Sequence, residues 1–110
     1  MSSTELTLDL RDIIFAIKEW LPINQLSESE KFSEFDLDTL EMMVQEGIRF
    51  AIEVVSPTRT ESDREGCRIE NGRVKVAKCL HEPYQKAYEM GWATMRVSQE
   101  YGGMGAPAIL

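Results

Sequence analysis

Two cysteines and the single histidine of the chain, Cys67, Cys79 and His81, are the residues best suited to metal chemistry. A structural zinc site takes four ligands and normally contains two cysteines separated by two to four residues. The C-x11-C-x-H spacing lacks such a pair, so we expect no metal here. No further residue is patterned to orient His81 for nucleophilic catalysis. A metal-dependent regulator stays open as an alternative that metal analysis would test.

The second candidate is the glycine-rich run SQEYGGMGAPAIL, residues 98–110. A phosphate-binding loop would continue into Lys and Ser or Thr, or would follow a strand as G-x-G-x-x-G. This run has neither feature and follows a predicted helix. Its glycines therefore indicate a helix C-cap and a turn between domains.

Composition limits the classes of protein that remain. The chain has 110 residues, 43% hydrophobic and 28% charged, which suits one soluble domain over residues 1–110. A net charge of −7 argues against nucleic-acid binding, because phosphate backbones attract cations. The apolar run at 13–17 is too short to span a membrane, and the start lacks the basic residues of a signal peptide. Two cysteines give no disulfide framework, so we expect a cytoplasmic protein.

The elements that would position these residues begin with a helix. Apolar residues recur at helical spacing from Leu10 to Leu21, and Pro22 should stop this helix at about Trp20. Residues 23–35 form a polar linker that also carries apolar side chains. We expect these to lie against the core: Ile23, Leu26, Phe32 and Phe35.

The second predicted helix begins near Asp36 or Asp38 and ends at Pro57. Asp38 with Glu41 has the spacing of a capping box, and both aspartates are better explained as caps than as an acid–base pair. The apolar residues of this helix cover more than one stripe of its surface. Such a helix is normally covered from several directions.

A loop is predicted for SPTRTESDREG, residues 56–66, followed by a hairpin in CRIENGRVKV, residues 67–76. The Asn71-Gly72 turn pairs Ile69 with Val74, Glu70 with Arg73 and Arg68 with Lys75. Pro83 opens a third helix whose apolar stripe runs from Tyr84 to Met95 and which should end by about Glu100. Gly91 within that stripe suggests that another backbone packs close to it. The fold class is mainly α, a small helical domain with one short β-hairpin.

Several short motifs occur in a characteristic order: Pro57, Asp63-x-x-Gly66, Gly72-x-Val74, Tyr88, Gly91-Trp92 and EYGGMGAP at 100–107. In this order and spacing the sequence resembles the N-terminal helical domain of acyl-CoA dehydrogenases. The opening LRDIIFAIKEW, residues 10–20, resembles the start of the longer subgroup that includes 3-methylmercaptopropionyl-CoA dehydrogenase.

The resemblance implies a flavoprotein parent, in which this domain precedes a middle β domain and a C-terminal four-helix domain. FAD and the acyl-CoA would lie between those two domains. A carboxylate of the C-terminal domain would take the α-proton while the flavin takes a hydride from the β-carbon. Electrons would pass to an electron-transferring flavoprotein, and the parent would be a dimer or tetramer. No FAD-contacting or catalytic motif of the family lies in residues 1–110.

We therefore expect a fragment that is itself inactive, binds no FAD and helps to wall the acyl pocket of its parent. The residues expected to approach substrate are Tyr101, Gly102, Gly103 and Met104, with a plain turn as the alternative. The broad apolar surface of the second helix predicts that the isolated chain self-associates. A stand-alone helical interaction or oligomerisation module is the alternative function, and the sequence that follows Leu110 would discriminate the two.

Overall fold

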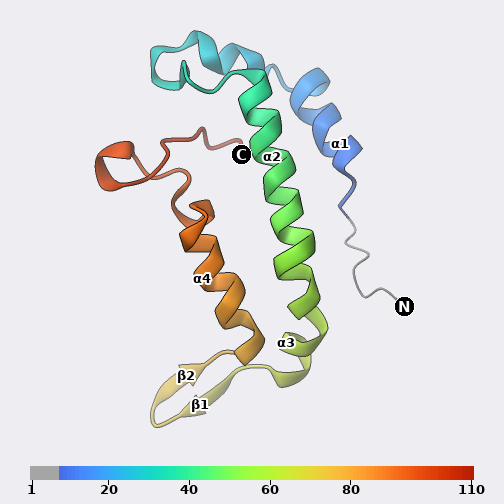
Figure 1. Ribbon diagram of the computed structural model, residues 1–110, viewed down its shortest axis with the longest axis vertical. Coiled ribbons are helices and arrows are strands. Elements are labelled where there is room, and N and C mark those ends of the chain that lie inside the picture. Colours follow the sequence, from blue (N-terminus) through green and yellow to red (C-terminus); the bar gives the residue numbers. More distant parts are fainter. Residues whose placement is uncertain (1–7) are drawn as a thin grey trace.

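Two helical segments run side by side along the molecule, and a β-hairpin joins them at one end (Figure 1). The structure is a computed structural model and describes residues 8–110. Its extents are 51 × 39 × 18 Å, so its thin dimension holds little more than one layer of helices, each about 10 Å across. The mainly helical fold with one short hairpin is confirmed. Among the described residues, no helix is long and apolar enough to cross a membrane.

Helix α1 comprises Leu10–Phe15 and continues as a π-helical turn, Ala16–Trp20. The Asp9 carboxylate caps it by accepting a hydrogen bond from the Arg11 N–H at 2.9 Å. The chain becomes extended at Leu21, before Pro22, which confirms the predicted end at Trp20. An ion pair of 2.6 Å between Lys18 and Glu41 joins α1 to the next helix.

The linker contains two 3-10 segments, Ile23–Glu28 and Glu30–Phe32, which the sequence did not predict. Its apolar side chains pack on the core as expected. Ile23 and Phe35 are buried, and Leu26 and Phe32 lie against them half-buried. Because these side chains fix the linker at both ends, its backbone folds into short helical turns between them.

Helix α2 comprises Leu37–Phe50 and begins at Asp36. The Asp36 carboxylate accepts a hydrogen bond from the Thr39 N–H at 2.8 Å. The predicted capping box of Asp38 and Glu41 is wrong, because Asp38 already lies in the first turn of the helix. Asp36 serves as the cap, so the interpretation of this aspartate as structural holds.

The Asp36 cap makes the stability of the domain depend on pH. Hydrogen bonds from the Thr39 side chain and N–H hold the pKa of Asp36 below its ordinary value of 3.8. A carboxyl whose folded pKa is lowered stabilises fully above its unfolded pKa, and this contribution is lost as pH falls through the folded value. We expect Asp36→Ala to destabilise the domain at about pH 7, with the loss shrinking at an acidic pH below 3.8. Urea unfolding at both values measures it.

Asp36→Asn is the matched control, because asparagine caps a helix and does not titrate. Its stability relative to Asp36→Ala should be the same at both pH values. An Asp36→Ala penalty that grows on acidification would contradict the cap as the origin of the effect.

The chain stays helical beyond α2. A π-helical turn, Ala51–Val55, leads into a 3-10 turn, Ser56–Thr58, and then into α3, Arg59–Glu65. The predicted helix end at Pro57 and the predicted loop over 56–66 are therefore wrong. Pro57 lies in the first turn of the next helical segment, where a missing N–H is tolerated. Gly66, with φ of +65°, ends α3.

The hairpin pairs β1, Arg68–Glu70, with β2, Arg73–Lys75, in the predicted antiparallel register. Asn71 and Gly72 have φ of +52° and +72°, as a tight two-residue turn requires. Ile69 and Val74 face each other but are 76% and 69% exposed. Within the described residues the hairpin thus has no covered face.

Helix α4 comprises His81–Glu89, with Pro83 buried in its first turn. The predicted continuation to Glu100 is wrong, because Gly91 has φ of +83° and breaks the helix before the 3-10 turn Trp92–Thr94. A Cβ on Gly91 would lie 2.7 Å from Cε of Met104, so a side chain packs there and not a second backbone. Tyr84 and Tyr88 of the predicted stripe are exposed.

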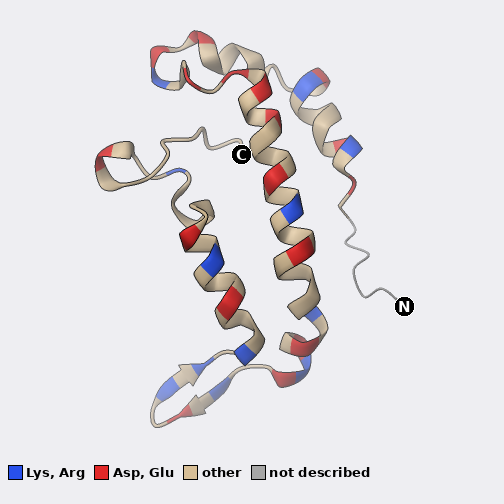
Figure 2. Cartoon of the chain, viewed as in Figure 1, with Lys and Arg blue, Asp and Glu red and all other residues tan. Residues whose placement is uncertain are grey.

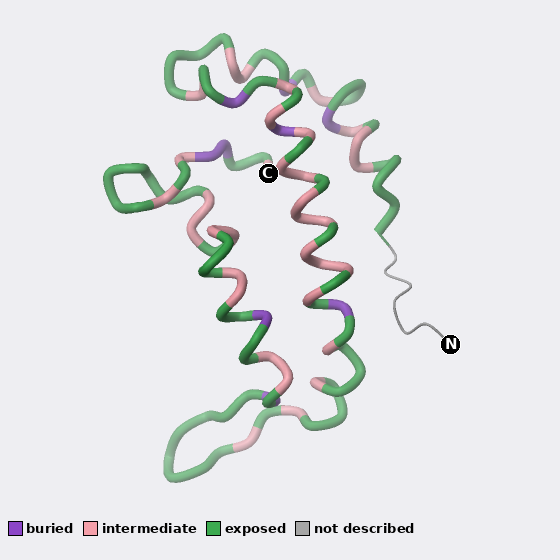
Figure 3. Tube along the Cα trace, viewed as in Figure 1, coloured by how far each residue is buried: buried purple, intermediate pink, exposed green. Residues whose placement is uncertain are grey.

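The hydrophobic core lies where α1, the linker, the start of α2 and the C-terminal segment meet. Its buried members are Ile17, Ile23, Phe35, Leu40 and Ala106. Within α2, Leu40 alone is fully buried, and most other apolar residues of that helix are half-buried (Figure 3). The broad cover that the sequence leads one to expect around α2 is not supplied by residues 8–110.

Candidate functional site

The four predicted substrate-facing residues lie on one closed loop, residues 95–106. Three backbone hydrogen bonds join its two limbs: Ala106 N–H to Met95 O at 3.0 Å, Gly105 N–H to Val97 O at 2.9 Å and Gly103 N–H to Ser98 O at 3.1 Å. A 3-10 turn, Gln99–Tyr101, forms the tip. The loop therefore has a fixed shape although it contains three glycines.

Glycine is needed in this loop for two different reasons. Gly102 and Gly105 have φ of +87° and +66°, which side-chain-bearing residues rarely adopt. Gly103 is needed because the limbs cross at this residue. A Cβ there would lie 2.0 Å from the carbonyl oxygen of Val97, far inside contact distance.

The loop exposes its predicted residues unequally. Tyr101 ends the 3-10 turn at the tip, with 77% of its surface exposed. Gly103 is half-buried at the crossing. The Met104 side chain returns to the body of the domain, where its methyl group lies against Gly91. Met104 is still 38% exposed, so Tyr101 is the most exposed side chain of this set and not the one exposed side chain.

The loop does not fit a phosphate group. The N–H groups of Tyr101, Gly102, Gly103 and Gly105 all donate to carbonyl oxygens of the loop itself, at 2.9 to 3.1 Å. A phosphate cradle needs such groups free and convergent. The residues of this loop are therefore unsuited to hold the diphosphate of FAD, the cofactor that the family resemblance implies for the parent.

A second feature is an apolar hollow of about 300 Å³ along α2. It is bounded by α1, α2, the turn that begins at Trp92 and the C-terminal residues. Its lining residues are Leu8, Ile13, Ile17, Met43, Val44, Gly47, Ile48, Ala51, Trp92, Met95, Ile109 and Leu110. The sequence pattern identified the apolar surface of α2. It gave no signal for Ile109 and Leu110, because these follow the glycine loop and belong to no periodic segment.

Trp92 forms one wall of the hollow. Its indole lies against Gly47, where an added Cβ would be 3.6 Å from the ring, and its centroid is 6.2 Å from that of Phe50. The indole N–H is buried and has no hydrogen-bond partner among residues 8–110. A buried unpaired N–H is unfavourable by about 1–3 kcal/mol. A hydrogen-bond acceptor brought to this N–H would therefore stabilise the domain.

The residues suited to metal binding, Cys67, Cys79 and His81, do not come together as a site. Cys67 is exposed, Cys79 is half-buried, and His81 is exposed at the start of α4. Burial, with smaller effects from Glu61 and Glu65, raises the pKa of the Cys79 thiol and so lowers its reactivity. Within the described part of the chain, no three His, Cys, Asp or Glu side chains come together as a potential metal site.

Comparisons with known proteins all point to one family. Residues 37–109 match the family model described as the acyl-CoA dehydrogenase N-terminal domain. The chain is 36% identical over 101 residues to a 3-methylmercaptopropionyl-CoA dehydrogenase from Ruegeria pomeroyi, covering 92% of this chain and 17% of that protein. It is 29% identical over 80 residues to a butyryl-CoA dehydrogenase from Syntrophomonas wolfei, covering 72% of this chain and 13% of that protein. The chain thus spans less than a fifth of either relative.

Proposed function

The chain belongs to the acyl-CoA dehydrogenase family as its N-terminal domain, and we propose that it works within a longer FAD-dependent enzyme. That enzyme would oxidise an acyl-CoA thioester. The thioester would lose a proton from its α-carbon and a hydride from its β-carbon, which leaves a double bond between these two carbons. The match over residues 37–109 carries this proposal. FAD would accept the hydride, and an electron-transferring flavoprotein would then reoxidise it.

The chemistry is assigned to parts of the polypeptide beyond this domain. The apolar hollow contains no acid or base, and the glycine loop is unsuited to phosphate. We propose a middle β domain and a C-terminal helical domain that hold the FAD and the catalytic carboxylate, in a cytoplasmic homo-oligomer. The half-buried surface of α2 supports this arrangement, since further helices of the same enzyme would cover it.

The role proposed for this domain is to wall the acyl pocket. The loop with Tyr101, Gly102, Gly103 and Met104 would approach the substrate. Its internal hydrogen bonds support this role, because a wall must keep its position when the substrate binds. Tyr101 offers an exposed aromatic ring at the loop tip for contact with an apolar chain.

A stand-alone interaction module is the less favoured function, because both relatives are dehydrogenases. The decisive experiment begins with the size of the native polypeptide by antibody and mass. A species much larger than 12.6 kDa, with flavin absorbance that bleaches when acyl-CoA is added, is the expected result. A native species of 12.6 kDa without flavin would overturn the enzyme proposal.

Tyr101→Ala in the full-length enzyme tests the pocket wall. We expect a KM for acyl-CoA raised about threefold to tenfold with kcat changed less, because a ground-state contact is lost. Tyr84→Ala removes another exposed tyrosine, 66% exposed, and should leave KM unchanged. Equal effects of the two substitutions would contradict a specific role for the loop.

A further inference from the structure

The hairpin is the basic part of an acidic chain (Figure 2). Residues 66–80 contain four basic residues and one acidic residue, a net charge of +3. Because the whole chain carries −7, the remaining residues carry −10. Arg73 and Lys75, on the strand after the turn, make no ion pair with any described residue. The hairpin thus presents two unneutralised cations beside the exposed pair of Ile69 and Val74.

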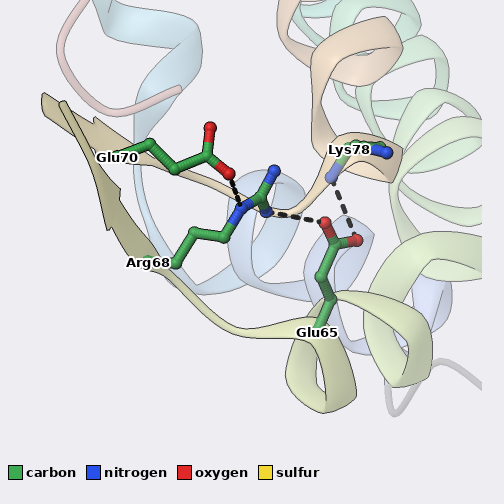
Figure 4. Close-up of polar contacts among 4 residues, drawn as sticks. All are labelled: Glu65, Arg68, Glu70 and Lys78. Atoms are coloured by element: carbon green, nitrogen blue, oxygen red, sulfur yellow. Dashed lines mark hydrogen bonds and ion pairs between the residues drawn. The ribbon is translucent and has the colours of Figure 1, made fainter.

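The base of this hairpin is held in place by one carboxylate (Figure 4). Glu65, at the end of α3, pairs with Arg68 Nη1 at 3.1 Å and accepts a hydrogen bond from the Lys78 N–H at 3.1 Å. Arg68 also contacts Glu70 through Nε at 2.6 Å, and these carboxylates, Glu70 first, raise the pKa of Arg68. The first strand and the turn that follows the second strand are therefore tied to α3, which preorganises the tip for contact with another molecule.

The opposite end of the molecule is acidic (Figure 2). Residues 28–38 contain five acidic residues and one lysine, a net charge of −4. A polar recess of about 330 Å³ opens there, and its charged lining residues are Glu30, Lys31 and Glu34, a net charge of −1. Lys31 lies over the Phe32 ring at 5.3 Å, and neither Glu30 nor Glu34 makes an ion pair within residues 8–110.

We propose that the hairpin tip of one copy docks in the acidic recess of a second copy, with Arg73 between Glu30 and Glu34. The second copy is the occupant because its recess complements the tip in charge, and the two surfaces lie too far apart to meet within one copy. Arginine with two carboxylates forms short, charge-assisted hydrogen bonds. Because the two surfaces lie at opposite ends of the molecule, two antiparallel copies can make this contact twice and form a closed two-fold dimer.

Sedimentation of the 110-residue chain tests this contact. At about 20 mM salt the average mass should rise with concentration more steeply than at about 500 mM salt, because screening shortens the range of charge interactions. Association through the apolar hollow would instead persist at high salt. An average mass that does not depend on salt, or a monomer under both conditions, would overturn the proposal.

Charge reversal gives the sharper result. Arg73→Glu alone and Glu34→Arg alone should each weaken low-salt association about tenfold or more, since a like charge then faces the partner. A mixture of the two variants should form a 1:1 complex, because one keeps its recess and the other keeps its hairpin. Arg59→Glu is the control, since it makes the same change in charge at an exposed α3 position. An equal loss in this control, or no complex in the mixture, would contradict the assignment.

Discussion

Leu40→Ala should lower the free energy of unfolding by about 2–5 kcal/mol, the largest loss that we expect from a single side chain of this domain. Leu40 is 0% exposed and lies in the middle of the core formed with Ile17, Ile23 and Phe35. Truncation removes buried methyl groups and leaves a cavity that the linker and α1 can fill only in part. A domain of this size has about 5–15 kcal/mol of stability in total, so much of it would be lost.

Thermal unfolding followed by circular dichroism measures this effect. A loss of this size should lower Tm by at least about 8 °C. Met42→Ala is the matched control on the same helix, because Met42 is 60% exposed and should change Tm little. Similar shifts for the two variants would show that α2 is not anchored through Leu40.

Gly103→Ala should open the closed loop and destabilise the domain by about 3 kcal/mol or more. The new methyl group would overlap the Val97 carbonyl, which is backbone and cannot swing away as a side chain can. The limbs must separate, and the hydrogen bonds from Gly103 to Ser98 and from Gly105 to Val97 would be lost. In the full-length enzyme we also expect a raised KM for acyl-CoA, because Tyr101 would be displaced.

Gly102→Ala separates this clash from the general effect of removing a glycine. A Cβ on Gly102 meets nothing within 4 Å, so its penalty should come from the positive φ alone, about 1–2 kcal/mol. Amide exchange of Gly103 and Gly105 provides a second measurement. It should accelerate in Gly103→Ala and change much less in Gly102→Ala. Equal protection in both variants would rule out the crossing of the limbs as the reason for Gly103.

Features governed by neighbouring residues could be predicted from the sequence. The Asn71-Gly72 turn sets the register of the hairpin by itself. Pro22 ends the helical segment at Trp20, because a proline disfavours helical geometry in the residue before it. Pro57 shows the limit of such rules. A proline ends a helix when its missing N–H breaks a regular turn, but here a π-helical turn precedes it and a new helical segment starts around it. No local pattern signals that change of geometry.

The candidate site also combines features that single residues predict with features that depend on the folded structure. The glycine run predicts a turn because glycine tolerates positive φ, and that property belongs to single residues. The need for Gly103 depends on Val97, and the hollow depends on α1, α2 and the C-terminal residues meeting in space. Gly91 combines both cases: it ends α4 by its own φ and is also packed by Met104, thirteen positions later in the chain.

The π-helical turn at Ala51–Val55 determines how far the residues that follow it are rotated around the helix axis. A π turn holds one residue more than an α turn, which rotates later side chains by about 100° around the helix axis. The apolar stripe of α2 ends before α3, because the α3 sequence RTESDRE is polar throughout. Deleting a single residue between 51 and 55 would restore the α phase and rotate α3, together with the hairpin that Glu65 and Arg68 hold to it, by about 100° relative to α2. The length of this turn therefore determines where the hairpin lies.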